Sequence, residues 1–244
     1  MAMGDSSCTV ILPTYKEAGS IRRMAMRLRE LYPDFFILIM DDNSRDGSKE
    51  LIDGLNDPMV RFMERDPGDR GLSASIFQGI AEAETEFFIN MDSDFQHPPE
   101  AVGPLYRCLL DGADLCVGIR EDRTALSPVR WLASWSAHFM AAMTLWLRNK
   151  KKSSDIMSGF FGGRTELYQS IIRKYGGEMD RHGFKALFDL LKFGPFDVKI
   201  CEAPFVFGKR STGESKLNKT VILSVLRQCE PFGKTMARVA GRLK

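Results

Sequence analysis

The chain has 244 residues, of which 44% are hydrophobic and 27% charged, with a formal net charge of +2. This length and ordinary composition fit one large domain or two small ones and exclude a low-complexity chain. The small net charge hides a basic C-terminal end: residues 205–244 contain nine Lys/Arg and two Asp/Glu, which favours phosphates, anionic lipid or nucleic acid as partners.

Strand and helix patterns alternate through the first half of the chain. Short apolar runs rich in β-formers are separated by amphipathic stretches, the pattern of a parallel α/β sheet flanked by helices. The run at 35–40 (FFILIM) is continuously apolar, as in a parallel strand covered on both faces. We predict strands at 8–12, 35–40, 60–64, 87–91 and 115–118, and helices at 20–32, 49–55, 71–84 and 99–110.

The second half of the chain is less regular. A helix is expected over 128–148, followed by a lysine run at 150–152, a Gly-rich segment, and helices and short strands. We see no internal repeat and no linker that would mark an independent second domain. We therefore predict one domain over 1–218, made of a regular half (1–120) and a less regular half (121–218), and then a basic amphipathic segment over 219–244.

The chain ends and the cysteines suggest a cytoplasmic protein. The start has no basic region followed by a long apolar run, so we expect no signal peptide. No window is apolar enough for a spanning helix. The five cysteines, at 8, 108, 116, 201 and 229, form no CxxC pair, which argues against a zinc site. An odd, scattered set predicts reduced thiols.

Polar clusters follow four of the predicted strands: TYKE after the first, DDNS after the second, DSDFQ after the fourth and Arg120 after the fifth. In open α/β sheets, ligands bind beyond the carboxyl ends of the strands. We therefore expect these clusters to converge on one crevice.

The DSDFQ cluster suggests a metal site. Asp92, Asp94 and Gln96 place oxygen ligands at i, i+2 and i+4, a set that suits Mg²⁺ or Mn²⁺ together with water and substrate phosphates. The alternative is a solvated acidic turn, because short acidic pairs are common in loops. The position after a buried strand favours the metal site.

The DDNS cluster suggests nucleotide recognition. A carboxylate directly after a buried strand can accept hydrogen bonds from a nucleobase or a ribose hydroxyl, and Tyr15 is placed to pack on a flat base. Helix capping would explain Asn43 or Ser44 but not two adjacent carboxylates, Asp41 and Asp42. An aromatic side chain at a strand end is as often part of the core.

Cations form the second half of the predicted site. Arg120, Arg130, Arg210 and Lys216 occur in segments rich in Gly, Ser and Thr, and the stretch GKRSTGESK (208–216) has three cations and no apolar residue. Such a loop can close over a diphosphate and neutralise its charge. The alternative is a basic surface loop.

Several common motifs are absent. There is no GxxxxGK[ST] phosphate loop, no GxGxxG after the first strand and no GxSxG elbow. The three histidines are too dispersed to form a ligand set. These absences argue against an ordinary ATPase, a dinucleotide-dependent enzyme and a serine hydrolase.

With these motifs in view, the chain resembles family 2 glycosyltransferases of the GT-A fold, and among them the dolichol-phosphate mannose synthases. The resemblance runs from VILPTYKEAGSI through DDNSRDGS, DRGLSASIFQG, NMDSDFQHPPE and SGFFGGRTEL to GKRSTGESKL. The early motifs are shared by many family 2 enzymes. GFKALFDLL with VFGKRSTGESKL is more specific to the polyprenyl-phosphate branch.

The resemblance implies that 1–218 is the catalytic domain, with 1–120 as its nucleotide-sugar half and 121–218 as its acceptor half with a closing loop. It also implies roles for matching positions. The nucleotide-sugar set would be Pro13, Tyr15, Glu17, Met40, Asp42, Asp92, Ser93, Asp94, Arg120, Arg210 and Lys216. Metal would be held by Asp92, Asp94 and Gln96, and the acceptor phosphate by Arg120, Arg130 and Ser134. Asp92, Asp94, Arg120, Arg210 and Lys216 would carry catalysis. The chain departs from the pattern at Trp135, where many relatives are basic, at Asp189, where the family usually has Glu, and in lacking spanning helices.

The implied activity is inverting transfer of mannose from GDP-mannose to dolichyl or polyprenyl phosphate, at the cytoplasmic face of a membrane and without nucleic acid. Membrane attachment would come from the 219–244 segment or from a membrane-anchored subunit. Glucosyl or aminosugar transfer from a UDP-sugar to polyprenyl phosphate is an alternative. A transferase acting on a hydroxyl would need a base, for which Asp189 is the candidate, and a non-catalytic nucleotide-binding partner of a membrane enzyme is a further alternative.

Overall fold

The computed structural model describes residues 8–121 and 139–208. Several predicted functional residues lie outside these ranges, and so does the predicted C-terminal segment. They are Arg130, Ser134, Trp135, Arg210, Lys216 and residues 219–244.

The fold is built on a seven-stranded sheet with the order β3-β2-β1-β4-β6-β5-β7. Six strands run parallel to one another, and β6 alone runs antiparallel to both of its neighbours, β4 and β5. The strands are β1 (Cys8–Thr14), β2 (Phe36–Asp41), β3 (Val60–Glu64), β4 (Phe87–Asn90), β5 (Leu115–Arg120), β6 (Phe161–Arg164) and β7 (Ile200–Phe205). The predicted, mostly parallel α/β architecture is confirmed.

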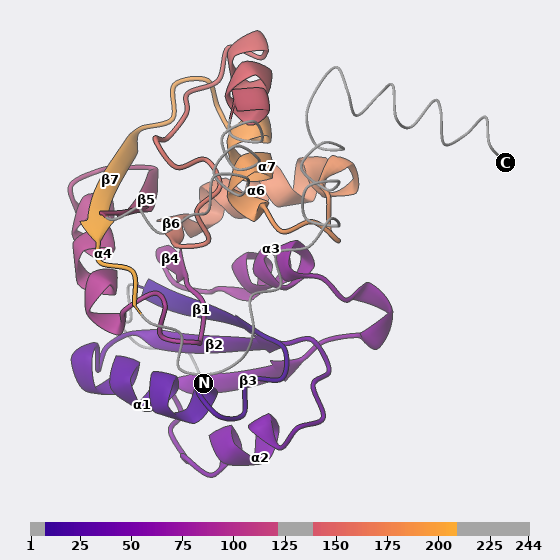
Figure 1. Cartoon of the computed structure of the whole chain (residues 1–244), viewed down its shortest axis with the longest axis vertical. Helices are drawn as coiled ribbons and strands as arrows, with labels where there is room; N and C mark the ends of the chain where they lie inside the picture. The colour runs from indigo at the N-terminus through magenta and orange to yellow at the C-terminus, as the bar shows by residue number, and fades with distance from the viewer. Residues whose placement is uncertain (1–7, 122–138, 209–244) are drawn as a thin grey trace, which may run out of the picture.

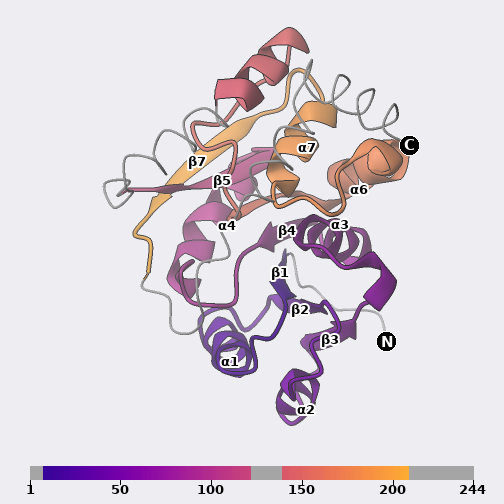
Figure 2. The same ribbon diagram turned by 45° about the vertical axis from the view of Figure 1, so that its right-hand side comes forward.

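Helices cover both faces of the sheet (Figures 1 and 2). One core cluster joins α1, α2 and α4 to the sheet, and the other joins α3, α6 and α7 to its opposite face. The helices are α1 (Ile21–Leu31), α2 (Ser48–Asp53), α3 (Leu72–Glu82), α4 (Val102–Leu110), α6 (Thr165–Tyr175) and α7 (Ala186–Phe193). Residues 139–147 are also helical, and single 3₁₀ turns occur at η1 (Pro67–Asp69), η2 (Pro99–Ala101) and η3 (Gly176–Glu178).

The sequence patterns explain why these elements form. All six residues of β2 are buried, as expected for a continuously apolar strand between two helical layers. Helix α1 buries Ile21, Met24, Ala25 and Leu28, whose spacing of three and four residues places them on one face. All nine elements predicted for the first half exist, and their ends lie within two residues of the predicted ends. The one exception is the predicted 99–110 helix, which opens with the 3₁₀ turn η2 before α4 begins at Val102.

The strand after β4 in the chain is not its neighbour in the sheet. The sequence pattern indicated a mostly parallel sheet but no strand order, and in the structure β6 enters between β4 and β5. Because β6 runs backwards, its first residue lies at the edge of the sheet where the parallel strands end. The Gly-rich segment before β6 therefore joins the loops that follow β1, β2, β3, β4, β5 and β7.

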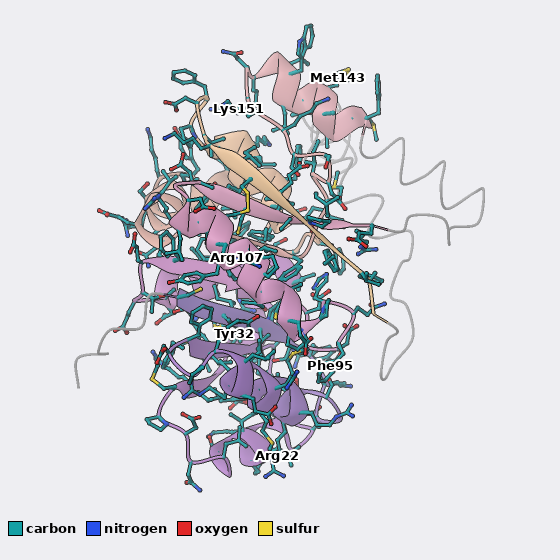
Figure 3. All side chains as sticks on the ribbon, turned by 90° about the vertical axis from the view of Figure 1, so that its left-hand side faces the viewer. Arg22, Tyr32, Phe95, Arg107, Met143 and Lys151 are labelled. Carbon is teal, nitrogen blue, oxygen red and sulfur yellow. A yellow bond between two sulfur atoms is a disulfide. The ribbon has the colours of Figure 1, made fainter. Side chains whose placement is uncertain are left out.

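The expectation of free thiols is wrong for two cysteines. Cys108 in α4 and Cys201 in β7 form a disulfide, and the two residues lie 93 positions apart in the sequence. Figure 3 shows α4 lying against the edge strand β7, which brings the two side chains together. Cys8 and Cys116 are free and buried, and Cys229 lies outside the described residues. Packing of distant elements, which the sequence spacing does not reveal, makes this pairing possible.

Among the helices of the described ranges, none combines the length and apolar character that crossing a membrane requires.

Candidate active site

The loops at the carboxyl edge of the sheet carry unusual backbone conformations. Lys16, Asn43, Arg45 and Phe95 have positive φ values between 51° and 65°. Side chains other than glycine seldom adopt this region, and such residues cluster at functional sites. The four lie in the loops after β1, β2 and β4, where the sequence predicts the site.

The loops after β1 and β2 are joined to each other. The backbone N–H of Lys16 donates to the Ser44 hydroxyl at 2.8 Å, and that of Ala18 donates to the Asp46 carboxylate at 3.1 Å. Ser44 is held in turn by Asp41, whose carboxylate accepts both its N–H and its hydroxyl. The two loops therefore form one rigid wall.

Asp42 is fixed by protein groups on both oxygens. Oδ1 accepts from the guanidinium of Arg65 and from the Ser75 hydroxyl at 2.9 Å, and Oδ2 accepts from the Gly71 N–H at 3.0 Å. The Arg65 side chain has no exposed surface. A buried carboxylate needs such partners, because burial of an unpaired charge is costly. The carboxylate predicted to meet the nucleotide is thus held in place by protein groups on both oxygens.

The other predicted nucleotide residues surround this wall. Pro13 pairs in register with Met40, and both are buried, Met40 completely and within the core. The ring of Tyr15 is half-buried and lies 5.4 Å from both the Lys16 ammonium and the Arg70 guanidinium. We call the loops after β1, β2 and β3 the nucleotide-side cluster. Met40 offers backbone but no exposed side chain to it.

Glu17 belongs to the same loop. Its carboxylate accepts a hydrogen bond from the Ser20 hydroxyl at 3.3 Å, and its carbonyl caps the start of α1 through the N–H groups of Ser20 and Ile21. These contacts shape the turn that carries Tyr15.

Asp92 differs from Asp42, because 41% of its side chain is exposed. Its backbone N–H donates to Nδ1 of His97 at 2.9 Å, which leaves that nitrogen without a proton. Burial lowers the pKa of the His97 imidazole, so the ring is uncharged at neutral pH. The ring stacks on Phe160 and meets Phe205 edge-on, with centroids 5.1 and 5.6 Å apart. His97 is thus a support for the loop that carries Asp92.

The rest of the acidic loop turns inward. Ser93 and Asp94 are each 3% exposed, and one oxygen of Asp94 accepts the Gln96 N–H at 3.0 Å. The carbonyl of Gln96 accepts the Gly208 N–H at 2.9 Å. A Cβ on Gly208 would lie 2.3 Å from the Phe95 carbonyl, so only glycine fits there. The segment that continues β7 into the predicted cationic loop therefore starts against the acidic loop, near Phe95 in Figure 3.

The residues present fit a divalent cation that is completed by its substrate. In the described ranges no three His, Cys, Asp or Glu side chains form a closed cage. Mg²⁺ and Mn²⁺ at nucleotide sites are commonly held by one or two carboxylates plus phosphates and water, so a cage is not required. Opposite Asp92 lies Gly159, where a Cβ would stand 3.8 and 3.9 Å from the two carboxylate oxygens. The missing side chain leaves room beside this carboxylate.

Two cations, Arg120 and Lys185, and a further acid, Asp155, lie near the acidic loop that carries Asp92. The guanidinium of Arg120 lies 3.8 Å from the centre of the Phe207 ring. Lys185 donates to the Met157 carbonyl at 3.0 Å, and burial lowers the pKa of its ammonium, partly offset by the nearby charges of Asp155 and Asp92. We call the loops after β4, β5 and β7 and the segment before β6 the metal-side cluster.

Sequence reasoning missed several of these residues. The sequence patterns assigned no role to Arg65, Asp69, Asp155, Arg181 or Lys185, and the fold brings them to the carboxyl edge of the sheet. The signal that could have found Asp69 and Lys185 is the position of each within a segment that the family resemblance marked, DRGLSASIFQG and GFKALFDLL.

Asp189, the candidate base for a hydroxyl acceptor, is 1% exposed and accepts the Asp180 N–H at 2.8 Å. The Asp189 carboxylate therefore holds the segment before α7 in place. The geometry thus gives no support to the hydroxyl-acceptor alternative.

A hollow of about 970 Å³ opens away from the crevice, between α3, α6 and the start of β4. Its lining, among the described residues, includes none of the residues predicted for the site. The described residues that were predicted for the site lie instead at the carboxyl edge of the sheet.

Comparison with known proteins agrees with this arrangement. The sequence model of glycosyl transferase family 2 matches residues 9–172. A dolichol-phosphate mannosyltransferase from Mycosarcoma maydis is 34% identical over 238 residues, which cover 91% of this chain and 77% of the relative.

Two solved structures share the fold. Glucosyl-3-phosphoglycerate synthase from Mycobacterium tuberculosis, in complex with Mn²⁺, UDP and glucosyl-3-phosphoglycerate, superposes with a TM-score of 0.62 at 18% identity, over 93% of this chain and 81% of the other. The mannosyltransferase PcManGT from Pyrobaculum calidifontis, in complex with GDP-Man and Mn²⁺, gives 0.55 at 16% identity, over 82% and 55%.

Proposed function

The chain belongs to glycosyl transferase family 2, and we propose that it transfers mannose from GDP-mannose to the phosphate of dolichol or a related polyprenol. The observation that carries the proposal is the pairing of two carboxylate loops at one edge of the sheet. Asp42 is fixed on the nucleotide side, and Asp92 is left accessible on the metal side. The 34% identity to a dolichol-phosphate mannosyltransferase supports the choice of sugar and acceptor.

The acceptor decides what the protein must supply. A lipid monophosphate has a second pKa near 6, so it is largely a dianion at neutral pH. A charged oxygen attacks without a strong general base, and catalysis then depends on positioning and electrostatics. This fits a crevice in which the candidate base, Asp189, is buried. In-line attack on the anomeric carbon inverts its configuration.

The protein groups divide the work between the two clusters. Tyr15 and Asp42 would hold the base and ribose, and Arg120 would lie against the phosphates, since its guanidinium stands on the Phe207 ring beside the acidic loop. The predicted Arg210, Lys216, Arg130 and Ser134 would add the closing loop and the acceptor-phosphate contacts.

Asp92, Asp94 and Gln96 would hold Mg²⁺ or Mn²⁺. When bound, the cation would stabilise the charge that develops on the leaving nucleoside diphosphate. The Mn²⁺ complexes of the two structures that share the fold support a divalent cation in this role.

We further infer that the protein works at a membrane surface, on its cytoplasmic face, because a lipid phosphate acceptor is confined to a bilayer surface. The basic segment 219–244 would bind the interface, or a membrane-anchored subunit would bring the enzyme to it.

The test is a panel of radiolabelled nucleotide sugars with polyprenyl phosphate and Mn²⁺, in which label is followed into organic solvent. We expect transfer from GDP-mannose and none from UDP-glucose. Transfer from a UDP-sugar would favour the second candidate, a polyprenyl-phosphate glucosyl or aminosugar transferase, because the fold also accommodates UDP in a relative. Nucleotide binding without transfer from any donor would indicate a non-catalytic partner.

A further inference from the structure

A short segment before α7 touches both clusters of the crevice. We call residues 181–185 the strap. Its first residue, Arg181, donates from Nε to Asp69 at 3.1 Å and from Nη2 to the other oxygen of the same carboxylate. Its last residue, Lys185, donates to the Met157 carbonyl at 3.0 Å. Asp69 belongs to the nucleotide-side cluster, and Met157 belongs to the metal-side cluster.

The nucleotide-side end of the strap connects directly to Asp42. Asp69 accepts Nη2 of Arg65 at 2.9 Å, and Nη1 of Arg65 binds Asp42. Arg65 also donates from Nε to Gln78 at 2.9 Å. A chain of charge-assisted hydrogen bonds, which are stronger and more directional than neutral ones, thus runs from Asp42 through Arg65 and Asp69 to Arg181.

Helix α3 fixes the middle of the strap. Its first N–H groups have no partners within the helix, and they use strap carbonyls instead. Ser73 donates to Gly183 from its N–H at 3.2 Å and from its hydroxyl at 2.9 Å, and Ala74 donates to Arg181 at 2.9 Å. Gly71 lies so close that a Cβ there would stand 2.5 Å from the Arg181 carbonyl. These contacts with α3 hold the strap in place beside the nucleotide-side cluster.

The metal-side end is fixed by the segment that carries Gly159. Met157 lies two residues before Gly159, and the Gly159 carbonyl accepts the Asn90 side-chain amide at 2.7 Å, just before Asp92. A displacement of Lys185 would be passed through Met157 to the surroundings of the Asp92 carboxylate.

We propose that the strap sets the spacing between the two clusters, with Arg181 and Lys185 as its positioning residues, so that a nucleoside diphosphate can engage both at once. The proposal rests on the proposed function, because it takes a nucleoside diphosphate as the ligand. A ligand that binds two subsites gains affinity from both only while their separation is fixed. A ligand that reaches one subsite gains nothing from the strap.

Calorimetry on the full chain tests the proposal with GDP plus Mn²⁺, which spans both clusters, and with GMP without metal, which engages the nucleotide side. We expect Arg181→Gln to weaken GDP–Mn²⁺ binding by about tenfold and GMP binding by less than about threefold. Lys185→Gln should likewise weaken GDP–Mn²⁺ binding more than GMP binding. The double variant should be no worse than the more affected single variant, because a strap released at one end is already released.

Controls separate positioning from folding. Arg61→Gln removes an exposed arginine of β3 that takes no part in the strap, and it should leave both affinities unchanged. Arg181→Lys keeps a cation opposite Asp69 and should restore part of the GDP–Mn²⁺ affinity. Thermal melting checks that each variant is folded.

Three results would overturn the proposal: unchanged GDP–Mn²⁺ affinity in Arg181→Gln, equal weakening of GDP–Mn²⁺ and GMP, or additive losses in the double variant. If the unmodified chain binds UDP–Mn²⁺ and not GDP–Mn²⁺, the same comparison is made with UDP and UMP. If it binds neither diphosphate, the proposed function fails, which is distinct from a failure of the strap.

Discussion

The carboxylates of Asp42 and Asp92 follow β2 and β4, the two strands that flank β1, yet their surroundings differ. Asp42 has both oxygens occupied by Arg65, Ser75 and Gly71. Asp92 has 41% of its side chain exposed, and Nδ1 of the uncharged His97 imidazole lies 3.6 Å from its carboxylate. The Asp42 carboxylate accepts hydrogen bonds from protein groups on both oxygens, whereas the Asp92 carboxylate remains accessible to a ligand.

This difference indicates a division of labour within one crevice. Under the proposed function, protein groups alone order Asp42, which would lower the cost of ordering on nucleotide binding. Asp92 would be completed by the cation and its substrate. A change at Asp42 should therefore damage folding together with binding, whereas a change at Asp92 should damage metal-dependent binding and transfer with little effect on folding.

The largest effect is expected from Asp92→Asn. Loss of the accessible carboxylate should reduce transfer by about 1000-fold, because stabilisation of the leaving diphosphate is lost. The free energy of unfolding should change by less than about 0.5 kcal/mol, since the substitution keeps the shape of a side chain that is 41% exposed. Initial rates over a range of Mn²⁺ concentrations and urea unfolding measure the two. Near-normal activity with an unchanged metal requirement would remove Asp92 from the metal site.

Asp42→Asn should break the nucleotide side in a different way. The amide cannot accept from Gly71 and balance the buried guanidinium of Arg65 at once, so we expect a loss of about 2 kcal/mol in unfolding free energy. Donor affinity should fall as well. Urea unfolding and GDP calorimetry report both quantities. A variant that is as stable as the unmodified chain would contradict the idea that Arg65 depends on Asp42.

Gly159→Ala tests the room beside Asp92. The added methyl group would meet Asp92 and His97 at ordinary contact distances of 3.5 to 3.9 Å, so the fold should tolerate it. It occupies space that a hydrated cation needs, and we expect a loss of activity of about threefold to tenfold with a higher Mn²⁺ requirement. Gly177→Ala is the matched control, because nothing lies within 4 Å of a Cβ there. Equal behaviour of the two variants would show that the space is not used.

The smallest effect concerns acid stability. Hydrogen bonds from Arg181, and the charges of Arg181 and Arg65, lower the pKa of Asp69 below its ordinary value of 3.8. A depressed carboxyl pKa stabilises the fold above the unfolded value, and this contribution is lost as pH falls through the folded value. Unfolding free energy should therefore decline below about pH 4. The decline should be shallower in Asp69→Asn, as followed by urea unfolding at several pH values. Parallel pH profiles would mean that the ion pair adds no stability.

Much of the nucleotide side could be predicted from the sequence. Strands such as 35–40 are continuously apolar and end at polar clusters, so the sheet and its functional edge follow from local pattern and the rule for open α/β sheets. The position of Asp92 after a buried strand is of the same kind. These features depend on residues that are neighbours in sequence, so the sequence pattern is enough to predict them.

Features made by distant segments could not be predicted. Nothing local indicates that β6 would enter between β4 and β5, or that Arg65 would be the buried centre of a charge network. The Cys108–Cys201 pairing contradicted the expectation from spacing, because it depends on α4 packing against the edge strand β7. The strap could not be predicted for the same reason, since its partners come from residues 69–74 and from Met157.

The Cys108–Cys201 bond also closes a covalent ring that contains every residue from 108 to 201. A protease that cuts the backbone once within this ring leaves the two fragments joined. A single clip would therefore pass unseen on a non-reducing gel and would appear as two bands only after a thiol is added.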